Sequence, residues 1–243
     1  IEEAYELNQK KTACVLGGMV WLKMGNRNVS TAIDLSGLGL DTIQEHDDEF
    51  VIGCMTSLHD LETNQALHEY THGAMRESLR HIVGVQFRNC ATVGGSIYGR
   101  YGFSDVLTMF LAMDTWVELY EAGRVPLTEF ADMKKDNDIL VNIIIRKTPL
   151  FCCYLSQRNT KTDFPVLTCA ASLIGDEART VIGARPARAK VAEDKEQILA
   201  GFVGMSRKQK EEAIEKFADY AAEKELLKAY KGKPSQTKDG VKV

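Results

Sequence analysis

Two short stretches of this sequence hold residues whose types and spacing could do chemistry. The first runs from Arg88 to Asp105 (RNCATVGGSIYGRYGFSD) and contains the adjacent glycines Gly94 and Gly95, between an expected strand and an expected helix. Glycine is unfavourable inside regular structure unless the backbone needs a positive φ or another group must approach the main chain closely. The stretch is therefore either a tight turn or the place where a ligand lies against the backbone.

The second stretch is HEYTH at residues 68–72, which matches the H-E-x-x-H pattern of zinc peptidases. On a helix, its two histidines would lie one turn apart and could bind Zn²⁺, with its glutamate as the general base. A third ligand would have to come from Glu77 or His81, on the same element. The sequence favours two polar histidines on a solvated helix face, and a zinc site is the alternative.

The hydrophobic pattern predicts the elements that position these stretches. Helices are expected at 2–11, 57–83, 105–114 and 207–230, and strands at 14–18, 30–37 and 138–147. Hairpins are expected at 41–56, with its turn at residues 46–48, and at 115–130. Three further strand-like runs, at 149–157, 164–175 and 178–186, indicate a small antiparallel sheet.

These elements predict an α+β protein with a domain boundary near Pro149. Residues 1–148 would form the first domain, and residues 149–231 a second domain with a three-stranded antiparallel sheet and helices. Residues 232–243 have almost no apolar content and are expected to be disordered. Because the chain starts within a helical pattern, we expect that a few residues precede Ile1.

Composition and charge narrow the class of function. The 243 residues are 44% hydrophobic and 26% charged, which is typical of globular proteins, and the net charge of -4 argues against a nucleic-acid or membrane-surface binder. No apolar run reaches the ~18 residues of a membrane span, and the N-terminus resembles no secretory signal. The six cysteines show no CxxC spacing, so we expect reduced thiols and a cytoplasmic protein.

Several segments occur in an order that resembles one protein family, the FAD-binding medium subunit of the molybdenum hydroxylases. That family includes xanthine dehydrogenase, carbon-monoxide dehydrogenase and nicotinate dehydrogenase. The resemblance covers about Glu2 to Gly201, and its most specific parts are two glycine turns in order, an R-N-x-x-T-x-G-G core and an aspartate beyond it. The segments are VLGGMVWL, TAIDLSGL, FVIGCMTSLHDLE, VQFRNCATVGGSI, SDVLTMFLAMDTWVEL, RVPLTEF, YLSQRNTKTDFPVLTCAASL and ARTVIGARPARAKVAE.

The resemblance implies a fold and a cofactor. The fold is the α+β FAD-binding type shared with vanillyl-alcohol-oxidase-like flavoproteins, with two α/β subdomains in residues 1–148. The diphosphate and ribityl chain of FAD would lie along the two glycine turns, where backbone N–H groups can approach an anion closely. An aspartate would accept hydrogen bonds from sugar or ribityl hydroxyls. The residues expected to bind FAD are Val15, Leu16, Gly17, Gly18, Met19, Val20, Ile82, Thr92, Val93, Gly94, Gly95, Ser96, Asp105, Leu140 and Leu155.

The sequence departs from the family pattern at the first glycine turn and near the flavin. Met19 and Val20 replace a usual Thr-Asp pair, so contacts there would come from the backbone. Leu155 stands where relatives place a lysine or an aromatic residue, and Arg158 or Lys161 could take that place instead.

Three aromatic residues follow the second glycine turn, Tyr98, Tyr101 and Phe103. They are expected to shield the flavin, to face a partner subunit or to pack in the ordinary way.

The implied function is electron transfer. In the family, a substrate is hydroxylated at a molybdopterin centre in a large subunit, and electrons pass through two [2Fe–2S] clusters of a small subunit to FAD, then to NAD or another acceptor. No catalytic residue and no metal ligand is expected in this chain. The apolar Met19–Val20 pair motivates one alternative, an assembly subunit of such a complex that has lost FAD.

Overall fold

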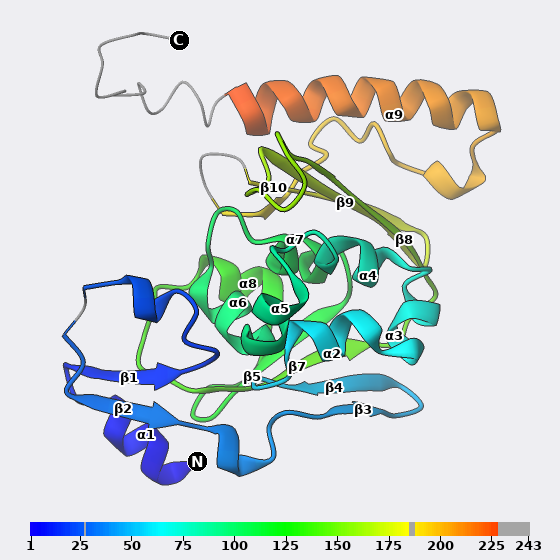
Figure 1. Ribbon diagram of the computed structural model, residues 1–243. Coiled ribbons are helices and arrows are strands. Elements are labelled where there is room, and N and C mark those ends of the chain that lie inside the picture. The colour runs from blue at the N-terminus through cyan, green and yellow to red at the C-terminus, as the bar shows by residue number, and fades with distance from the viewer. Residues whose placement is uncertain (27, 185–187, 228–243) are drawn as a thin grey trace, which may run out of the picture.

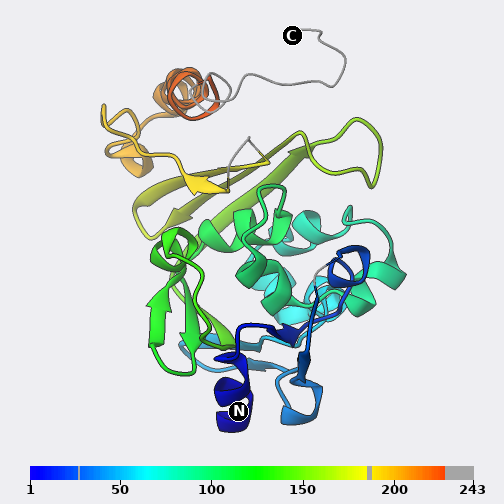
Figure 2. The same ribbon diagram turned by 90° about the vertical axis from the view of Figure 1, so that its left-hand side faces the viewer.

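The computed structural model describes residues 1–26, 28–184 and 188–227. It places a layer of helices between two antiparallel sheets, as Figures 1 and 2 show from two directions. This mixture of helices and antiparallel sheets confirms the α+β fold class that the sequence predicts. Within the described part of the chain, no helix combines the length and apolar character needed to cross a membrane.

A small N-terminal unit carries the first glycine turn. It consists of one helix packed on two parallel strands, α1 (Glu2–Asn8), β1 (Ala13–Leu16) and β2 (Thr31–Asp34). The first strand ends before the expected residue 18, because Gly17 and Gly18 leave the strand and start a turn. Two short 3₁₀ helices lie beside these strands, η1 (Leu22–Met24) and η2 (Ser36–Leu38).

A five-stranded antiparallel sheet supports the helical layer, in the order β3-β4-β7-β5-β6. Its strands are β3 (Ile43–Glu45), β4 (Glu49–Gly53), β5 (Thr115–Leu119), β6 (Gly123–Pro126) and β7 (Leu140–Arg146). Both expected hairpins are present, but the second ends at Pro126, where helix α8 (Leu127–Asp132) begins. The apolar run that predicted a buried strand is β7, the central strand of the sheet.

The helical layer differs most from the prediction. The single helix expected over 57–83 is three helices, α2 (Leu58–Thr63), α3 (Gln65–Tyr70) and α4 (Ala74–Leu79). Asn64 breaks it with an extended backbone and caps α3, and Gly73 breaks it again at φ 86°. The strand expected before the glycine pair is helix α5 (Val85–Cys90), and the pair itself lies inside α6 (Val93–Gly99). Helix α7 (Asp105–Leu111) is buried along its whole length.

The second sheet has four strands instead of the three expected. In the order β11-β10-β9-β8, they are β8 (Leu150–Gln157), β9 (Leu167–Ile174), β10 (Glu177–Gly183) and β11 (Lys190–Val191). The short β11 pairs with β10 through only two pairs of residues. The helix η3 (Phe202–Gly204), the helix α9 (Arg207–Ala221) and a π-helical turn (Ala222–Leu227) follow. The tail expected to be disordered, 232–243, lies outside the described residues.

One hydrophobic core runs through the layer and both sheets. It joins Phe50 and Phe110 to Tyr154, Ala170 and Val181 of the second sheet. Helix α9 covers the outer face of that sheet with a smaller cluster of its own, in which Phe217 is buried. Residues 148 and 149, where the sequence predicts the domain boundary, lie in the connection between β7 and β8. A division of the chain into two domains at this point is a proposal.

Candidate functional site

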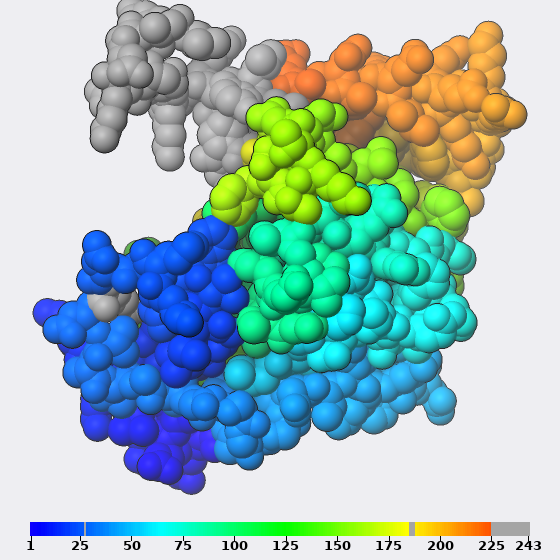
Figure 3. Space-filling model, viewed as in Figure 1, coloured from blue at the N-terminus to red at the C-terminus, as the bar shows by residue number. Residues whose placement is uncertain are grey.

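A cavity of about 840 Å³ lies between the N-terminal unit and the helical layer. This volume is in the range of small-molecule sites, which is about 300–1,000 Å³. In Figure 3 the N-terminal segment, in blue, lies against the helical layer, in green. Residues from both parts line the cavity. Most of the wall comes from four stretches of the chain: 13–22, 82–106, 135–140 and 158–165.

The two glycine turns meet at this cavity, although they are far apart in the sequence. A Cβ atom added to Gly17 would lie 2.7 Å from Thr92 Oγ1 and 3.8 Å from Gly95 Cα. Side chains at these positions would therefore fill the space between the turns. The contact between the turns explains why both carry glycine.

The second turn is the first turn of helix α6, and its amides are used within the protein. Thr92 is the N-cap, and its Oγ1 accepts a hydrogen bond of 3.1 Å from Gly95 N. Gly94 N donates to Cys54 O at 2.8 Å, and a Cβ at Gly94 would lie 2.6 Å from that oxygen. A Cβ at Gly95 would meet only Thr92 Oγ1, at 3.0 Å. Gly94 is therefore required by packing, whereas Gly95 faces open space.

The first turn has a different character. The N–H groups of Gly18, Met19 and Val20 donate to no acceptor among the described residues. Met19 has a left-handed φ of 56°, which is unusual for a residue with a side chain. Successive amides in such a turn form a concave anion site. Gly18 is held against the end of helix α5, directly before the second turn, because a Cβ there would lie 1.6 Å from Cys90 O.

A buried carboxylate also lines the cavity. Asp105 is 5% exposed, and its Oδ1 accepts a 2.6 Å hydrogen bond from Tyr154 Oη and an ion pair from Arg158 Nη2. Burial raises the pKa of Asp105, and its hydrogen bond from Tyr154 and the charge of Arg158 oppose that rise. No hydrogen bond from another described residue reaches Oδ2. That oxygen can accept a hydrogen bond from a hydroxyl group of a ligand.

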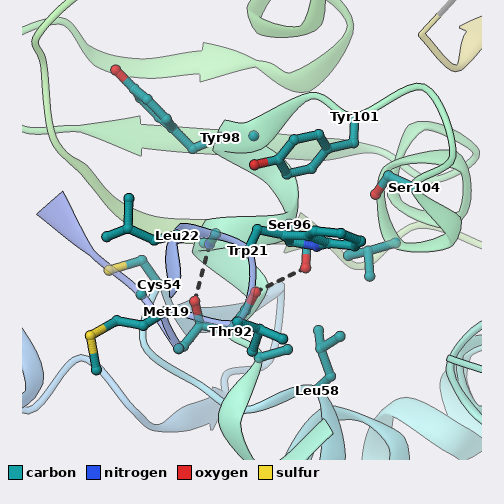
Figure 4. A pocket seen from close by; sticks show the side chains of 18 of the residues that line it. Met19, Trp21, Leu22, Cys54, Leu58, Thr92, Ser96, Tyr98, Tyr101 and Ser104 are labelled. Carbon is teal, nitrogen blue, oxygen red and sulfur yellow. Dashed lines mark hydrogen bonds between the residues drawn. The ribbon is translucent and has the colours of Figure 1, made fainter. Parts of the chain in front are cut away.

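Four aromatic rings, from three separate loops, form an aromatic cluster at the cavity. Trp21 lies 5.5 Å from Phe103 and 5.6 Å from Phe164, and Tyr101 stacks on Phe103 at 5.3 Å. Figure 4 shows Trp21 beside Tyr101. Close by, the Ser96 hydroxyl donates a hydrogen bond to the carbonyl oxygen of Thr92. The aromatic cluster gives the cavity an apolar wall, in which Tyr101 and Phe103 are nearly parallel at 10° and Trp21 is tilted by 51° from Phe103.

Tyr98 lies outside this cluster. Its hydroxyl donates to Asp136 O at 2.7 Å, and burial raises its pKa to about 12.

All but two of the residues that the sequence predicted for a ligand line the cavity. Val93 is fully buried in the core instead, and Leu155 is 71% exposed on β8. The alternation of β8 explains the position of Leu155, because its neighbour Tyr154 faces the core. Of the two substitutes considered for Leu155, Arg158 lines the cavity and Lys161 does not.

Sequence reasoning missed a larger part of the cavity wall, including Trp21, Phe164 and Lys135. Trp21 directly follows the first glycine turn, and that position was the signal available for it.

The zinc-peptidase geometry is not formed. Helix α3 ends at Tyr70, and His72 has a left-handed φ of 50°, so His68 and His72 do not lie one turn apart on one helix. Both histidines line a separate open hollow against β8. Among residues 1–26, 28–184 and 188–227, no group of three His, Cys, Asp or Glu residues could hold a metal ion.

The fold and cavity agree with one protein family. Residues 1–148 match the family model described as the FAD binding domain in molybdopterin dehydrogenase, and the chain belongs to this family. It is therefore an FAD-binding chain of an oxidoreductase family, as the sequence resemblance predicts.

A curated relative is the uncharacterized protein YgfM of Escherichia coli K12, which is 24% identical over 181 residues. That match spans 71% of this chain and 66% of YgfM, slightly less than two thirds of its length.

Solved structures share the fold at low sequence identity. Carbon monoxide dehydrogenase from Hydrogenophaga pseudoflava, in a form that lacks the Mo-pyranopterin moiety of its molybdenum cofactor, has a TM-score of 0.77 at 21% identity and covers 98% of this chain and 86% of its own. Quinoline 2-oxidoreductase from Pseudomonas putida 86 has a TM-score of 0.71 at 18% identity, covering 96% and 94%. Reconstituted CO dehydrogenase from Oligotropha carboxidovorans has a TM-score of 0.72 at 21% sequence identity. The match covers 82% of this chain and 77% of that chain.

Proposed function

We propose that this chain holds FAD in the cavity described above, as the electron-transfer flavoprotein subunit of a molybdenum-containing hydroxylase or dehydrogenase. One observation carries the proposal: two glycine turns from distant parts of the chain meet, and one of them presents three amides that donate to no acceptor in the described part of the chain. A dinucleotide diphosphate needs such close, side-chain-free backbone. The cavity residues therefore fit the cofactor that the family name implies.

Each part of the cavity would hold a different part of FAD. The amides of Gly18, Met19 and Val20 would bind the diphosphate, and Gly95 would leave room for it. Asp105 would accept hydrogen bonds from ribityl or sugar hydroxyls through its open Oδ2.

The apolar walls would hold the rings. The rings of the aromatic cluster would contact the isoalloxazine, and Ile82 and Leu140 would pack against the flavin or the adenine. Together these groups would exclude water from the ring system.

The partners follow from the same proposal. Bound FAD exchanges electrons between one-electron and two-electron carriers. The electrons would come from [2Fe–2S] clusters in a small partner subunit, after substrate oxidation in a large molybdopterin-binding subunit, and would leave to NAD or another acceptor. This is supported by the six cysteines of this chain, which are all free thiols, and by the structural neighbours, which are a carbon monoxide dehydrogenase with a molybdenum cofactor and a quinoline 2-oxidoreductase. Free thiols also support the proposed cytoplasmic location.

The test is a visible absorption spectrum of the complex purified with its native partners, followed by release and identification of the flavin. We expect absorption near ~450 nm over a broad iron–sulfur background, and one FAD for each copy of this chain. Iron–sulfur absorption without releasable flavin would contradict the proposal. The chain would then be an assembly subunit that kept the fold and lost FAD.

A further inference from the structure

Two cations line the cavity within the described residues, and their surroundings differ. Arg158 is neutralised by the buried carboxylate of Asp105. Lys135 has no carboxylate partner among the described residues, and its Nζ donates a 3.1 Å hydrogen bond to Gly99 O. Lys135 is therefore the cavity cation without a direct ion pair among the described residues, although three carboxylates besides that of Asp105 line the same cavity.

Lys135 also lies close to other positive charges. Burial lowers the pKa of Lys135, and the charges of Arg100 and Arg188 lower it further. Arg100 is 5% exposed, its guanidinium lies 4.0 Å from the ring centre of Phe130, and its Nε is buried without a hydrogen-bond partner. Carboxylates offset part of the repulsion among these cations, because Arg188 pairs with Asp132 at 3.6 Å and the charge of Asp136 opposes the lowering of the pKa of Arg100.

The position of Lys135 relates it to the glycine turns. Gly99, whose carbonyl holds Nζ, is the last residue of α6, and the same helix begins next to Thr92. Seven helical residues span about 10 Å, so the carbonyl of Gly99 lies about one helix length from the second turn. A lysine side chain is long and flexible enough to shorten this distance when an anion is bound.

We propose that Lys135 supplies the positive charge that holds the diphosphate of the bound dinucleotide in this chain. This inference rests on the proposed function and adds a residue to it. The first turn has two apolar side chains, Met19 and Val20, and the second turn has no spare amides. A cation at Lys135 would offset the charge of a diphosphate that these turns do not neutralise.

The test compares flavins that differ in charge. Dissociation constants for FAD and for uncharged riboflavin are measured with the full chain and with the variants Lys135→Gln and Lys135→Arg. Lys134→Gln is the matched control, because Lys134 is exposed like Lys135 but does not line the cavity. Binding is measured at 50 and 300 mM salt, and circular dichroism and melting temperature check folding.

We expect Lys135→Gln to weaken FAD binding about tenfold, which corresponds to one charge-assisted contact of about 1.4 kcal/mol, and to leave riboflavin binding unchanged. The salt dependence of FAD binding should also become shallower, and Lys135→Arg should restore both properties. Unchanged FAD binding and an unchanged salt slope in Lys135→Gln would overturn the inference alone. Equal weakening for both flavins would also overturn it, since Lys135 would then only fasten Gly99. A parent chain that binds no FAD would overturn the proposed function as well.

Discussion

The two glycine turns perform different tasks, although both are expected from the same sequence feature. In the second turn, the amides of Val93, Gly94, Gly95 and Ser96 all donate within the protein, at 2.8 to 3.1 Å. In the first turn, three consecutive amides donate to no described residue. The second turn therefore provides shape, and the first provides hydrogen-bond donors. A glycine pair alone does not distinguish these roles.

The glycines within each turn also differ. Gly18 and Gly94 each lie against the backbone of the protein itself, at Cys90 and Cys54. Gly17 and Gly95 lie against the side chain of Thr92 and leave the space between the turns open. One glycine in each pair thus serves the fold, and the other serves the cavity.

The largest effect is expected for a glycine that serves the fold. Gly18→Val should destabilise the protein by at least about 3 kcal/mol, because its Cβ would overlap the carbonyl oxygen of Cys90. Denaturant unfolding measures this change. Gly37→Ala is the control, since nothing lies within 4 Å of its added Cβ, and its stability should be unchanged. A Gly18→Val protein as stable as the control would contradict the close packing of the two turns.

A glycine that serves the cavity should affect binding instead of folding. Gly95→Val is expected to fold, because only the Thr92 hydroxyl lies near its Cβ, but its side chain would occupy the place of the diphosphate. We expect at least a tenfold loss of FAD content, measured by flavin release from the purified protein. Full flavin content in a folded Gly95→Val protein would remove this turn from the proposed site.

Thr92 connects the two turns, so its hydroxyl should have a moderate effect. Thr92→Val removes the acceptor of Gly95 N, and the loss of a helix N-cap costs about 1 kcal/mol. For a chain of this size, that loss lowers the melting temperature by about 2–4 °C. Thr92→Ser keeps the acceptor and should melt close to the parent. Equal melting of Thr92→Val and the parent would show that the cap does not stabilise α6.

The smallest effect is expected at the first turn. Met19 has a left-handed backbone, which costs a residue with a side chain about 1 kcal/mol, and Met19→Gly removes this strain. The greater flexibility of glycine in the unfolded chain partly cancels the gain in stability. Stability should change by less than about 1 kcal/mol, and FAD affinity by less than about threefold, because the amide remains. A large loss of affinity in Met19→Gly would mean that the methionine side chain itself contacts the cofactor.

Much of the fold could be predicted from local pattern. The β3–β4 hairpin, the buried strand β7 and the helix α7 follow from apolar spacing and turn residues, and the structure confirms them. The prediction of a single helix over 57–83 was wrong, because the apolar periodicity does not reveal the two residues that interrupt it. These are Asn64, which is extended, and Gly73, which is left-handed. The short α5 was missed because its six residues contain valine and phenylalanine, which favour strands.

The candidate site was predictable only where a motif marks it. The glycines and Asp105 belong to a recognisable spacing, so they could be named from the sequence. Lys135, Phe164 and the Arg158–Asp105 pair depend on loops that come together only in the folded chain. No spacing in the sequence signals such contacts, because they join segments about 30 to 140 residues apart.

The aromatic cluster has a practical consequence, since one of its members is among only two tryptophans in the chain. Trp21 stands at the cavity, whereas Trp116 lies on the five-stranded sheet, 4.2 Å from the guanidinium of Arg146. Tryptophan emission overlaps flavin absorption, so a flavin beside Trp21 would quench its fluorescence by energy transfer. In a Trp116→Phe protein, the remaining emission would report occupancy of the cavity directly. Trp21 is thus an intrinsic fluorescence probe for ligand binding in the cavity.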